Sequence, residues 1–379
     1  MQYRISTAFG VLIALMQIIM PAVTASAAPQ PSGAEQVRAD EWHLGFLGVA
    51  NANRISRGAG VTIGVPDTGV DPHPDLADNL LPGIDMTASG DGRRDLDGHG
   101  TAMAGLIAAH GQRDGTGTLG IAPEAKILPI RGKPVSDGGH AEQLAAGIEY
   151  AVRQGADVIC ISAVTQRNAR LEHAVKMALR ANIVIVAAAG NRPDDTSVGY
   201  PASQDGVIAV AGVDRLGRHA AVSVTGPEID VAAPAVDIYS TSYDGKYSKG
   251  TGTSAATAIV AGAAALVRSK FPNLPAREVA HRLTATAIDK GPPGRDDEYG
   301  YGVIDLVAAL TADVPPLGFE SVAATPPASA QATAPGDNAG DGATARGLAT
   351  LGVLVAAGGG YLVWRRRRRA DDPPPRISR

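Results

Sequence analysis

Short apolar runs alternate with amphipathic stretches between Gly60 and about Thr311. The runs are continuously apolar, which is typical of strands that are covered on both faces. Residues 140–152 and 170–180 place apolar side chains four apart, as on one face of a helix. Strand–helix–strand repetition therefore predicts an α/β domain whose doubly wound, mainly parallel sheet carries helices on both faces. The expected strands are 61–65, 126–130, 158–161, 183–187, 207–213 and 229–232.

One stretch, residues 249–262, is a glycine-rich turn followed by alanine, glycine and branched apolar residues. A helix without a polar face past its first turn must be buried on all sides. Ser254 stands where the turn becomes the helix. The unpaired N–H groups at a helix start favour negative charge, so an oxyanion would be stabilised beside this hydroxyl.

Three further polar residues stand at element ends upstream of Ser254. Asp67 follows the apolar run 61–65, and His99 stands between a glycine turn and a small-residue stretch. Asn191 follows the run 183–187 in the same way. Alone, each is most often a turn, cap or surface residue. Their joint occurrence in the order Asp, His, Ser favours a nucleophilic serine with a histidine base.

The segments around these residues resemble the signatures of the subtilisin-like serine proteases, the subtilases. The resemblance implies that Ser254 attacks a peptide carbonyl, that His99 transfers the proton and that Asp67 orients the imidazole. It also implies that the Asn191 amide donates to the oxyanion. Two further segments match those that flank the specificity pocket, where we expect a small or apolar substrate side chain. Their residues are Ser162, Ala163, Val164, Ala188, Ala189 and Gly190.

Two features depart from the subtilase pattern. Pro66 precedes Asp67 where an aliphatic residue is usual, and because proline cannot donate to a ladder, we expect the strand to end or distort there. After Ser254, Ala255, Thr257 and Ala258 replace the more usual residues, which leaves the start of the serine helix open.

The amino-terminal 58 residues precede the domain. Residues 1–27 have a positive start at Arg4, an apolar run 9–20 and a small-residue cleavage site, which predicts a secretory signal peptide. An uncleaved anchor is the alternative, and both place the domain outside the cytoplasm. Residues 28–58 are interpreted as an N-terminal extension that lies on the domain, too short for a separate inhibitory fold. Cys160, the one cysteine, lies in an apolar run and is expected to be a buried core thiol.

Composition changes after the predicted protease domain, residues 59–311. Residues 312–345 are rich in Pro, Ala, Thr and Gly and predict a linker. Residues 346–364 predict a transmembrane helix, and the arginines of the basic tail 365–379 place that tail in the cytoplasm. A soluble C-terminal tail is the alternative. The tail has a net charge of +5, whereas the whole chain has −4. The rest of the chain therefore carries about −9 and is a poor candidate for nucleic-acid binding.

The order of signal, extension, protease domain, linker, helix and basic tail resembles the mycosins, the membrane-anchored subtilases of type VII secretion. This resemblance implies a cell-membrane protein with an extracytoplasmic domain that processes secreted substrates. The alternative is a membrane-tethered scaffold of the secretion complex with a weak or inactive site. We expect no cofactor and no metal, because the histidines lack metal-ligand spacing and no cage of oxygen ligands is evident.

Overall fold

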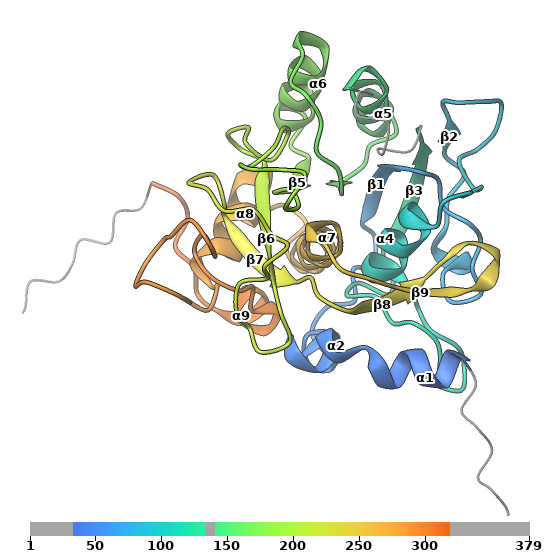
Figure 1. The fold of residues 1–379 in the computed structure, drawn as a ribbon, viewed down its shortest axis with the longest axis horizontal. Coiled ribbons are helices and arrows are strands. Elements are labelled where there is room, and N and C mark those ends of the chain that lie inside the picture. Colours follow the sequence, from blue (N-terminus) through green and yellow to red (C-terminus); the bar gives the residue numbers. More distant parts are fainter. Residues whose placement is uncertain (1–32, 133–140, 319–379) are drawn as a thin grey trace, which may run out of the picture. The chain divides into compact units, whose positions relative to one another are not determined.

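One seven-stranded parallel sheet forms the centre of the computed structural model, which describes residues 33–132 and 141–318 (Figure 1). The strand order is β2-β3-β1-β4-β5-β6-β7. The predicted doubly wound parallel sheet is confirmed, and the six expected strands begin and end within two residues of their predicted bounds. The strands are β1 Thr62–Asp67, β2 Ile84–Asp85, β3 Lys126–Arg131, β4 Val158–Ile161, β5 Val184–Ala188, β6 Ile208–Val213 and β7 Val231–Pro234.

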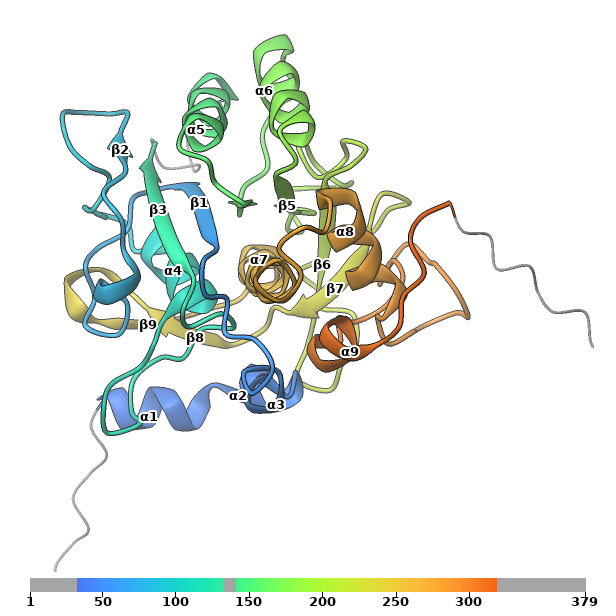
Figure 2. The ribbon, with the colours of Figure 1, turned by 180° about the vertical axis from the view of Figure 1, so that it is seen from behind.

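Helices cover both faces of this sheet (Figures 1 and 2). Helices α5 (Ala141–Arg153) and α6 (Ala169–Arg180) pack on one face, and α4 (His99–Ala108) and α7 (Thr253–Lys270) on the other. Strand β4 shows why residues 158–161 had to be apolar without interruption. Val158 and Cys160 join the core beside α7, whereas Ile159 and Ile161 join the core beside α5 and α6.

Helix α7 is surrounded by other elements, as its lack of a polar face predicted. Thr253 and every residue from Ala255 to Arg268 are buried. Small side chains permit this close packing: a Cβ on Gly262 would lie 2.7 Å from the Cβ of Ile121. The helix therefore fits only with residues of this size along its length.

The expectation that β1 ends or distorts at Pro66 was wrong. The strand continues to Asp67, and Pro66 pairs in unbroken register with Ile130 of β3. On the other side, the pairing with β4 covers only Ile63 and Gly64. Pro66 therefore lies where β1 has one partner strand instead of two, and its missing N–H is tolerated there.

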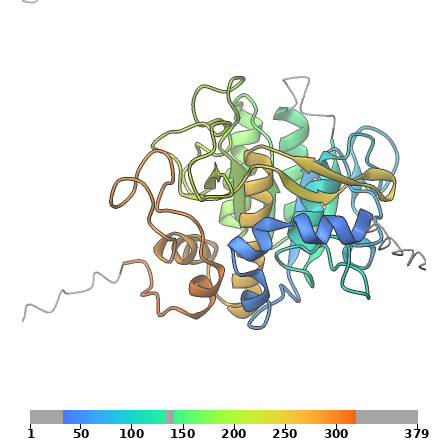
Figure 3. The ribbon, with the colours of Figure 1, turned by 60° about the horizontal axis from the view of Figure 1, so that its bottom comes forward.

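The remaining elements surround this core. The antiparallel hairpin β8–β9 was not predicted, because it lacks a strong apolar pattern. Figure 3 shows α1 beside this hairpin. The elements are α1 Gly33–Asp40, α2 Trp42–Phe46, α3 Val49–Ala52, β8 Ile238–Thr241, β9 Tyr247–Gly250, α8 Ala276–Ala285 and α9 Leu306–Thr311, with 3₁₀ turns at Ala77–Asn79 and Tyr243–Gly245.

Polar contacts hold the segment that contains α1 and α2 on the domain. The Arg38 guanidinium donates to Gly117 O at 2.7 Å, and the Trp42 indole donates to Val236 O at 3.1 Å. The buried Glu41 carboxylate accepts from the backbone N–H of Leu119 at 3.2 Å. Burial raises the pKa of Glu41 to about 8, although the charge of Arg38 and the Leu119 N–H oppose this shift.

Cys160 is free and buried, as predicted. In the part of the chain that the structure describes, no helix combines the length and the apolar character needed to cross a bilayer. The predicted signal peptide, the predicted transmembrane helix and most of the predicted linker lie outside the described residues.

Glu41→Gln should change how stability depends on pH. Because the folded-state pKa of Glu41 is raised to about 8 from 4.5, wild-type stability falls as pH rises between these values. Glutamine cannot ionise, so the variant should match the wild type near pH 4.5 and be more stable above pH 8, by about 3–5 kcal/mol. Denaturant unfolding across this pH range measures the difference.

The half-exposed Glu124 provides the control, because its ion pair with Arg57 lies at the surface, where such pairs contribute little to stability. Glu124→Gln should shift stability little at either end of the range. If the difference in unfolding free energy between Glu41→Gln and the wild type stays constant from pH 4.5 to pH 9, the raised pKa of Glu41 is contradicted.

Candidate active site

Asp67 and His99 meet at the carboxyl edge of the sheet. Asp67 is the last residue of β1 and is buried, and His99 is the first residue of α4. The His99 Nδ1 atom lies 2.8 Å from Asp67 Oδ1 and 2.9 Å from Oδ2. Because Nδ1 is engaged, Nε2 is the ring nitrogen left to act on another group.

The loop before His99 is shaped by a second carboxylate. Asp95 accepts hydrogen bonds from Gly98 N at 2.9 Å and from both the N–H and the hydroxyl of Thr101. Burial opposes ionisation of Asp95, but these hydrogen bonds outweigh it and lower its pKa. Gly100 is required at the helix start, since a Cβ there would lie 2.1 Å from Gly69 O. The loop and this glycine together bring the imidazole against the end of β1.

The neighbouring charges make His99 a strong base. The charge of Asp67 raises the pKa of His99 to about 9, against the lowering effect of burial, with smaller contributions from Asp97 and Asp95. The His99 side chain is nevertheless 32% exposed, so it remains accessible to a substrate. A base of this strength holds its proton at neutral pH and releases it in alkaline solution.

Ser254 is the second residue of α7, as its position in the sequence predicted. Its Oγ donates to Ser162 O at 3.1 Å, and the Ser162 hydroxyl donates in return to Ser254 O at 3.1 Å. Among the described residues, no hydrogen bond joins Ser254 to His99. Both side chains line one cleft of about 500 Å³, so the structure brings them together without a direct bond.

Asn191 follows β5 and lines the same cleft. Its Oδ1 accepts from Thr253 N at 2.9 Å and from the Thr253 hydroxyl at 3.2 Å. Nδ2 has no acceptor within the described ranges and is therefore available to donate to a ligand. Thr253 was not predicted as a site residue, because its only signal in the sequence is its place immediately before Ser254.

Five of the six residues expected to contact substrate line this cleft: Ser162, Ala163, Val164, Ala188 and Gly190. Ala189 is the exception and does not contribute to the lining. Its side chain is buried in the core, its N–H donates to Val210 O and its carbonyl accepts from Gly199 N. Because its N–H already donates to Val210 O, Ala189 has no N–H left to pair with a peptide.

The cleft also contains acids that the sequence analysis did not assign to it. Asp97, Asp194 and Asp195 belong to its lining, and no lysine or arginine of the described chain does. The Val164 side chain packs closely on Gly199, since a Cβ on that glycine would lie 2.2 Å from Val164 Cγ1. The other apolar side chains in the cleft lining, Ala163 and Ala188, are small.

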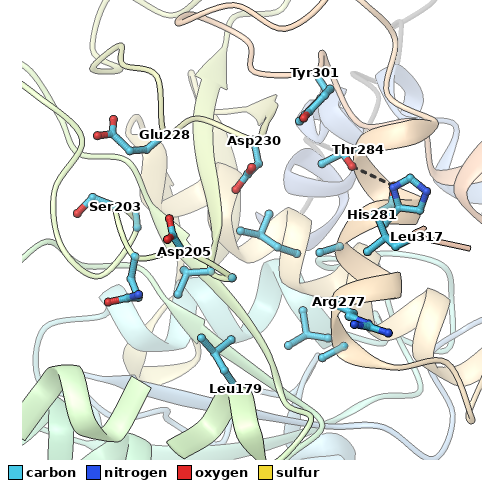
Figure 4. A pocket seen from close by; sticks show the side chains of 18 of the residues that line it. Leu179, Ser203, Asp205, Glu228, Asp230, Arg277, His281, Thr284, Tyr301 and Leu317 are labelled. Atoms are coloured by element: carbon cyan, nitrogen blue, oxygen red, sulfur yellow. Dashed lines mark hydrogen bonds between the residues drawn. The ribbon is translucent and has the colours of Figure 1, made fainter. Parts of the chain in front are cut away.

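A second cavity, of about 590 Å³, lies at the opposite ends of the strands, beside the starts of β5, β6 and β7. Figure 4 shows Asp205, Glu228 and Asp230 on one side of it and Arg277 and His281 on the other. It contains none of the predicted site residues, so its larger volume does not make it the catalytic site. Across the described ranges, no three His, Cys, Asp or Glu residues are grouped to hold a metal ion.

Comparison with known proteins identifies the class that this fold and site define. The model of the Subtilase family matches residues 58–302, about two thirds of the chain. The chain belongs to this family and is a serine endopeptidase with a subtilisin-like α/β fold.

Particular relatives extend the similarity. Mycosin-3 of Mycobacterium tuberculosis is 36% identical over 82% of this chain and 80% of its own length. Subtilisin DY of Bacillus licheniformis is 40% identical over 67% of this chain and 92% of its own length. A solved structure of the MycP3 protease from the type VII (ESX-3) secretion system superposes with a TM-score of 0.64 at 36% identity, covering 75% of this chain and 90% of that one.

The His99 imidazole should titrate near pH 9, well above the ordinary value of 6.5. Because Asp67 is the largest cause of the raised pKa, Asp67→Asn should move the titration down by at least one unit. The extra stability from the protonated imidazole is present below pH 6.5 and is lost as pH rises through 9. NMR of the labelled imidazole measures the titration directly.

His173 offers an internal reference, because it lies on the exposed side of α6, away from the cleft. At any one pH, its ring signals should coincide in the wild type and in Asp67→Asn, because the substitution lies far from it. A His99 midpoint near 6.5 in the wild type would show that the carboxylate does not act on the ring as the geometry implies.

Proposed function

We propose that the chain is a membrane-anchored extracytoplasmic serine endopeptidase that cleaves peptide bonds through Asp67, His99 and Ser254. The observation that carries the proposal is the 2.8 Å contact between His99 Nδ1 and Asp67 in the cleft that Ser254 lines. The subtilase match supports the reaction class.

In the proposed mechanism, the Ser254 hydroxyl turns from Ser162 O toward the His99 imidazole. Ser254 Oγ attacks the substrate carbonyl while His99 Nε2 takes its proton, and Asp67 stabilises the resulting imidazolium. His99 then gives the proton to the leaving amine, which breaks the peptide bond and leaves an acyl-enzyme. Water, deprotonated by His99, hydrolyses the ester and restores Ser254.

The developing oxyanion needs donors that are already in place. The Asn191 Nδ2 amide is one candidate, because Thr253 holds its Oδ1 and leaves its N–H groups for the cleft. The backbone N–H of Ser254 is the second, because the N–H groups in the first turn of a helix have no intrahelical acceptor. The positive end of α7 favours the same charge.

The biological setting rests on relatives and on the sequence. The similar mycosins and the MycP3 protease from a type VII secretion system support action on type VII secretion substrates. The predicted signal peptide and transmembrane helix support a single-pass protein at the cell membrane, with its protease domain outside and its C-terminus in the cytoplasm. The small or apolar residues Ala163, Val164 and Ala188 in the cleft lining support a preference for small or apolar residues before the scissile bond.

A second function is favoured by one observation. The Ser254 hydroxyl donates to Ser162 O and has no hydrogen bond to His99, as expected of a site with weak activity. In this alternative, the chain is a tethered scaffold of the secretion complex whose cleft binds segments without cutting them.

A fluorophosphonate probe separates the two functions, because it modifies only a serine that a neighbouring base activates. The wild-type chain should be labelled at Ser254, faster as pH rises toward 9, where His99 loses its proton. Ser254→Ala should abolish labelling, and Ser162→Ala, which leaves the nucleophile in place, should retain it. Absence of labelling in folded wild-type protein at pH 9 would support the scaffold instead.

Membrane fractionation tests the predicted anchor. The full chain should sediment with membranes and require detergent for release, because an uncharged run of about twenty residues suffices to span a bilayer. A chain that ends at residue 345 should be released to the medium, whereas one that ends at residue 369 keeps the five arginines and should stay membrane-bound. Release of the full chain without detergent would contradict the anchor.

A further inference from the structure

Two reciprocal hydrogen bonds between Asn191 and Asp195 close the turn that contains Asn191. Asp195 Oδ2 accepts from the backbone N–H of Asn191 at 2.7 Å, and the backbone N–H of Asp195 donates to Asn191 O at 2.8 Å. Both distances lie at the short end of the ordinary range for N–H···O hydrogen bonds. The backbone of Asn191 is therefore fixed by Asp195 in the same way that its side-chain oxygen is fixed by Thr253.

The Asp195 carboxylate also fits closely against the residue before Asn191. Gly190 has φ +122°, in the left-handed region, and a Cβ there would lie 2.9 Å from Asp195 Oδ2. Gly190 N donates to the Thr253 hydroxyl at 3.3 Å. The carboxylate thus occupies the space beside Gly190, and the backbone before the Asn191 amide has little freedom to move.

We propose that Asp195 is a positioning residue for the oxyanion site, acting through the backbone of Asn191; this inference rests on the proposed role of Asn191 as oxyanion donor. A donor stabilises an oxyanion strongly only if it needs no reorganisation when charge develops. Asp195 supplies the acceptor that fixes the start of the Asn191 side chain, and Thr253 fixes its far end.

The charge of Asp195 does not contribute to this role. A carboxylate in the cleft lining disfavours a nearby oxyanion by Coulomb repulsion. What Asp195 contributes is therefore the place of its acceptor oxygen. An asparagine keeps an oxygen at that place without the charge, whereas a glutamate keeps the charge but moves the oxygen by one methylene.

Substitutions at Asp195 test the proposal by steady-state hydrolysis of a tetrapeptide p-nitroanilide with alanine before the scissile bond, using the full chain. Asp195→Ala should lower kcat about tenfold with KM within about twofold, because donor alignment acts in the transition state. Asp195→Asn should stay within about threefold of the wild type, and Asp195→Glu should be impaired like the alanine variant. If Asp195→Ala fails to fold, the contrast between the asparagine and glutamate variants decides the question.

Asp214 is the matched control for a purely structural effect. Its carboxylate also closes a turn, after β6, by accepting from Leu216 N at 2.9 Å and from Arg218 N at 3.0 Å; it pairs in addition with the Arg218 guanidinium and lies outside the cleft lining. Asp214→Ala should lower the melting temperature about as much as Asp195→Ala, because both remove a turn closure, while leaving kcat unchanged.

A double-mutant cycle links the effect to the oxyanion donor. Asn191→Ala should lower kcat by roughly 10²–10³, the magnitude seen in the related subtilisin, and Asp195→Ala should add almost nothing in that background. Additive losses, or an unchanged kcat in Asp195→Ala, would overturn the positioning role. An unchanged kcat in Asn191→Ala would overturn the oxyanion assignment and the role of Asp195 with it. If kcat is unchanged in Asn191→Ala but activity is lost in Ser254→Ala, the proposed protease function stands, and only the roles of Asn191 and Asp195 are overturned.

Discussion

The close packing of α7 against the sheet is the constraint on which the site depends. Eighteen residues of mostly alanine, glycine and branched apolar type let the helix lie buried across the sheet. Its first turn therefore emerges at the carboxyl edge, where β1 and β5 end in Asp67 and in the turn of Asn191. In open parallel sheets, this edge is where ligand sites form. A bulkier residue at Gly262 would meet Ile121 and displace the helix and, with it, Ser254.

The sequence could predict the features that depend on local pattern and residue type. Runs such as 158–161 had to be strands covered on both faces, and β4 divides its side chains between the two cores. The site residues were predictable because each stands at the end of an element where chain direction changes. The parallel topology then places those ends on one edge, although the residues are far apart in sequence.

The features that the sequence did not reveal depend on contacts between distant segments. The Pro66 prediction was wrong because the length of the β4 ladder beside β1 cannot be read from β1 alone. Ala189 was expected to contact substrate, but its backbone bonds to Val210 and Gly199, just after β5, hold its side chain in the core. The links from Asn191 to Thr253 and Asp195 join side chains to backbone groups and leave no periodic signal.

The raised pKa of His99 and the orientation of the serine hydroxyl are consistent with each other. With its pKa raised to about 9 by the charge of Asp67, His99 is protonated at neutral pH and offers no acceptor on either ring nitrogen. The Ser254 O–H must then find another acceptor, and Ser162 O lies 3.1 Å away. When His99 loses its proton, Nε2 becomes an acceptor. The Ser254 hydroxyl is then no longer restricted to its hydrogen bond with Ser162 O. Loss of the imidazolium proton must therefore precede nucleophile activation, in which the neutral imidazole takes the serine proton, and the acids around His99 set the pH at which the neutral ring is available.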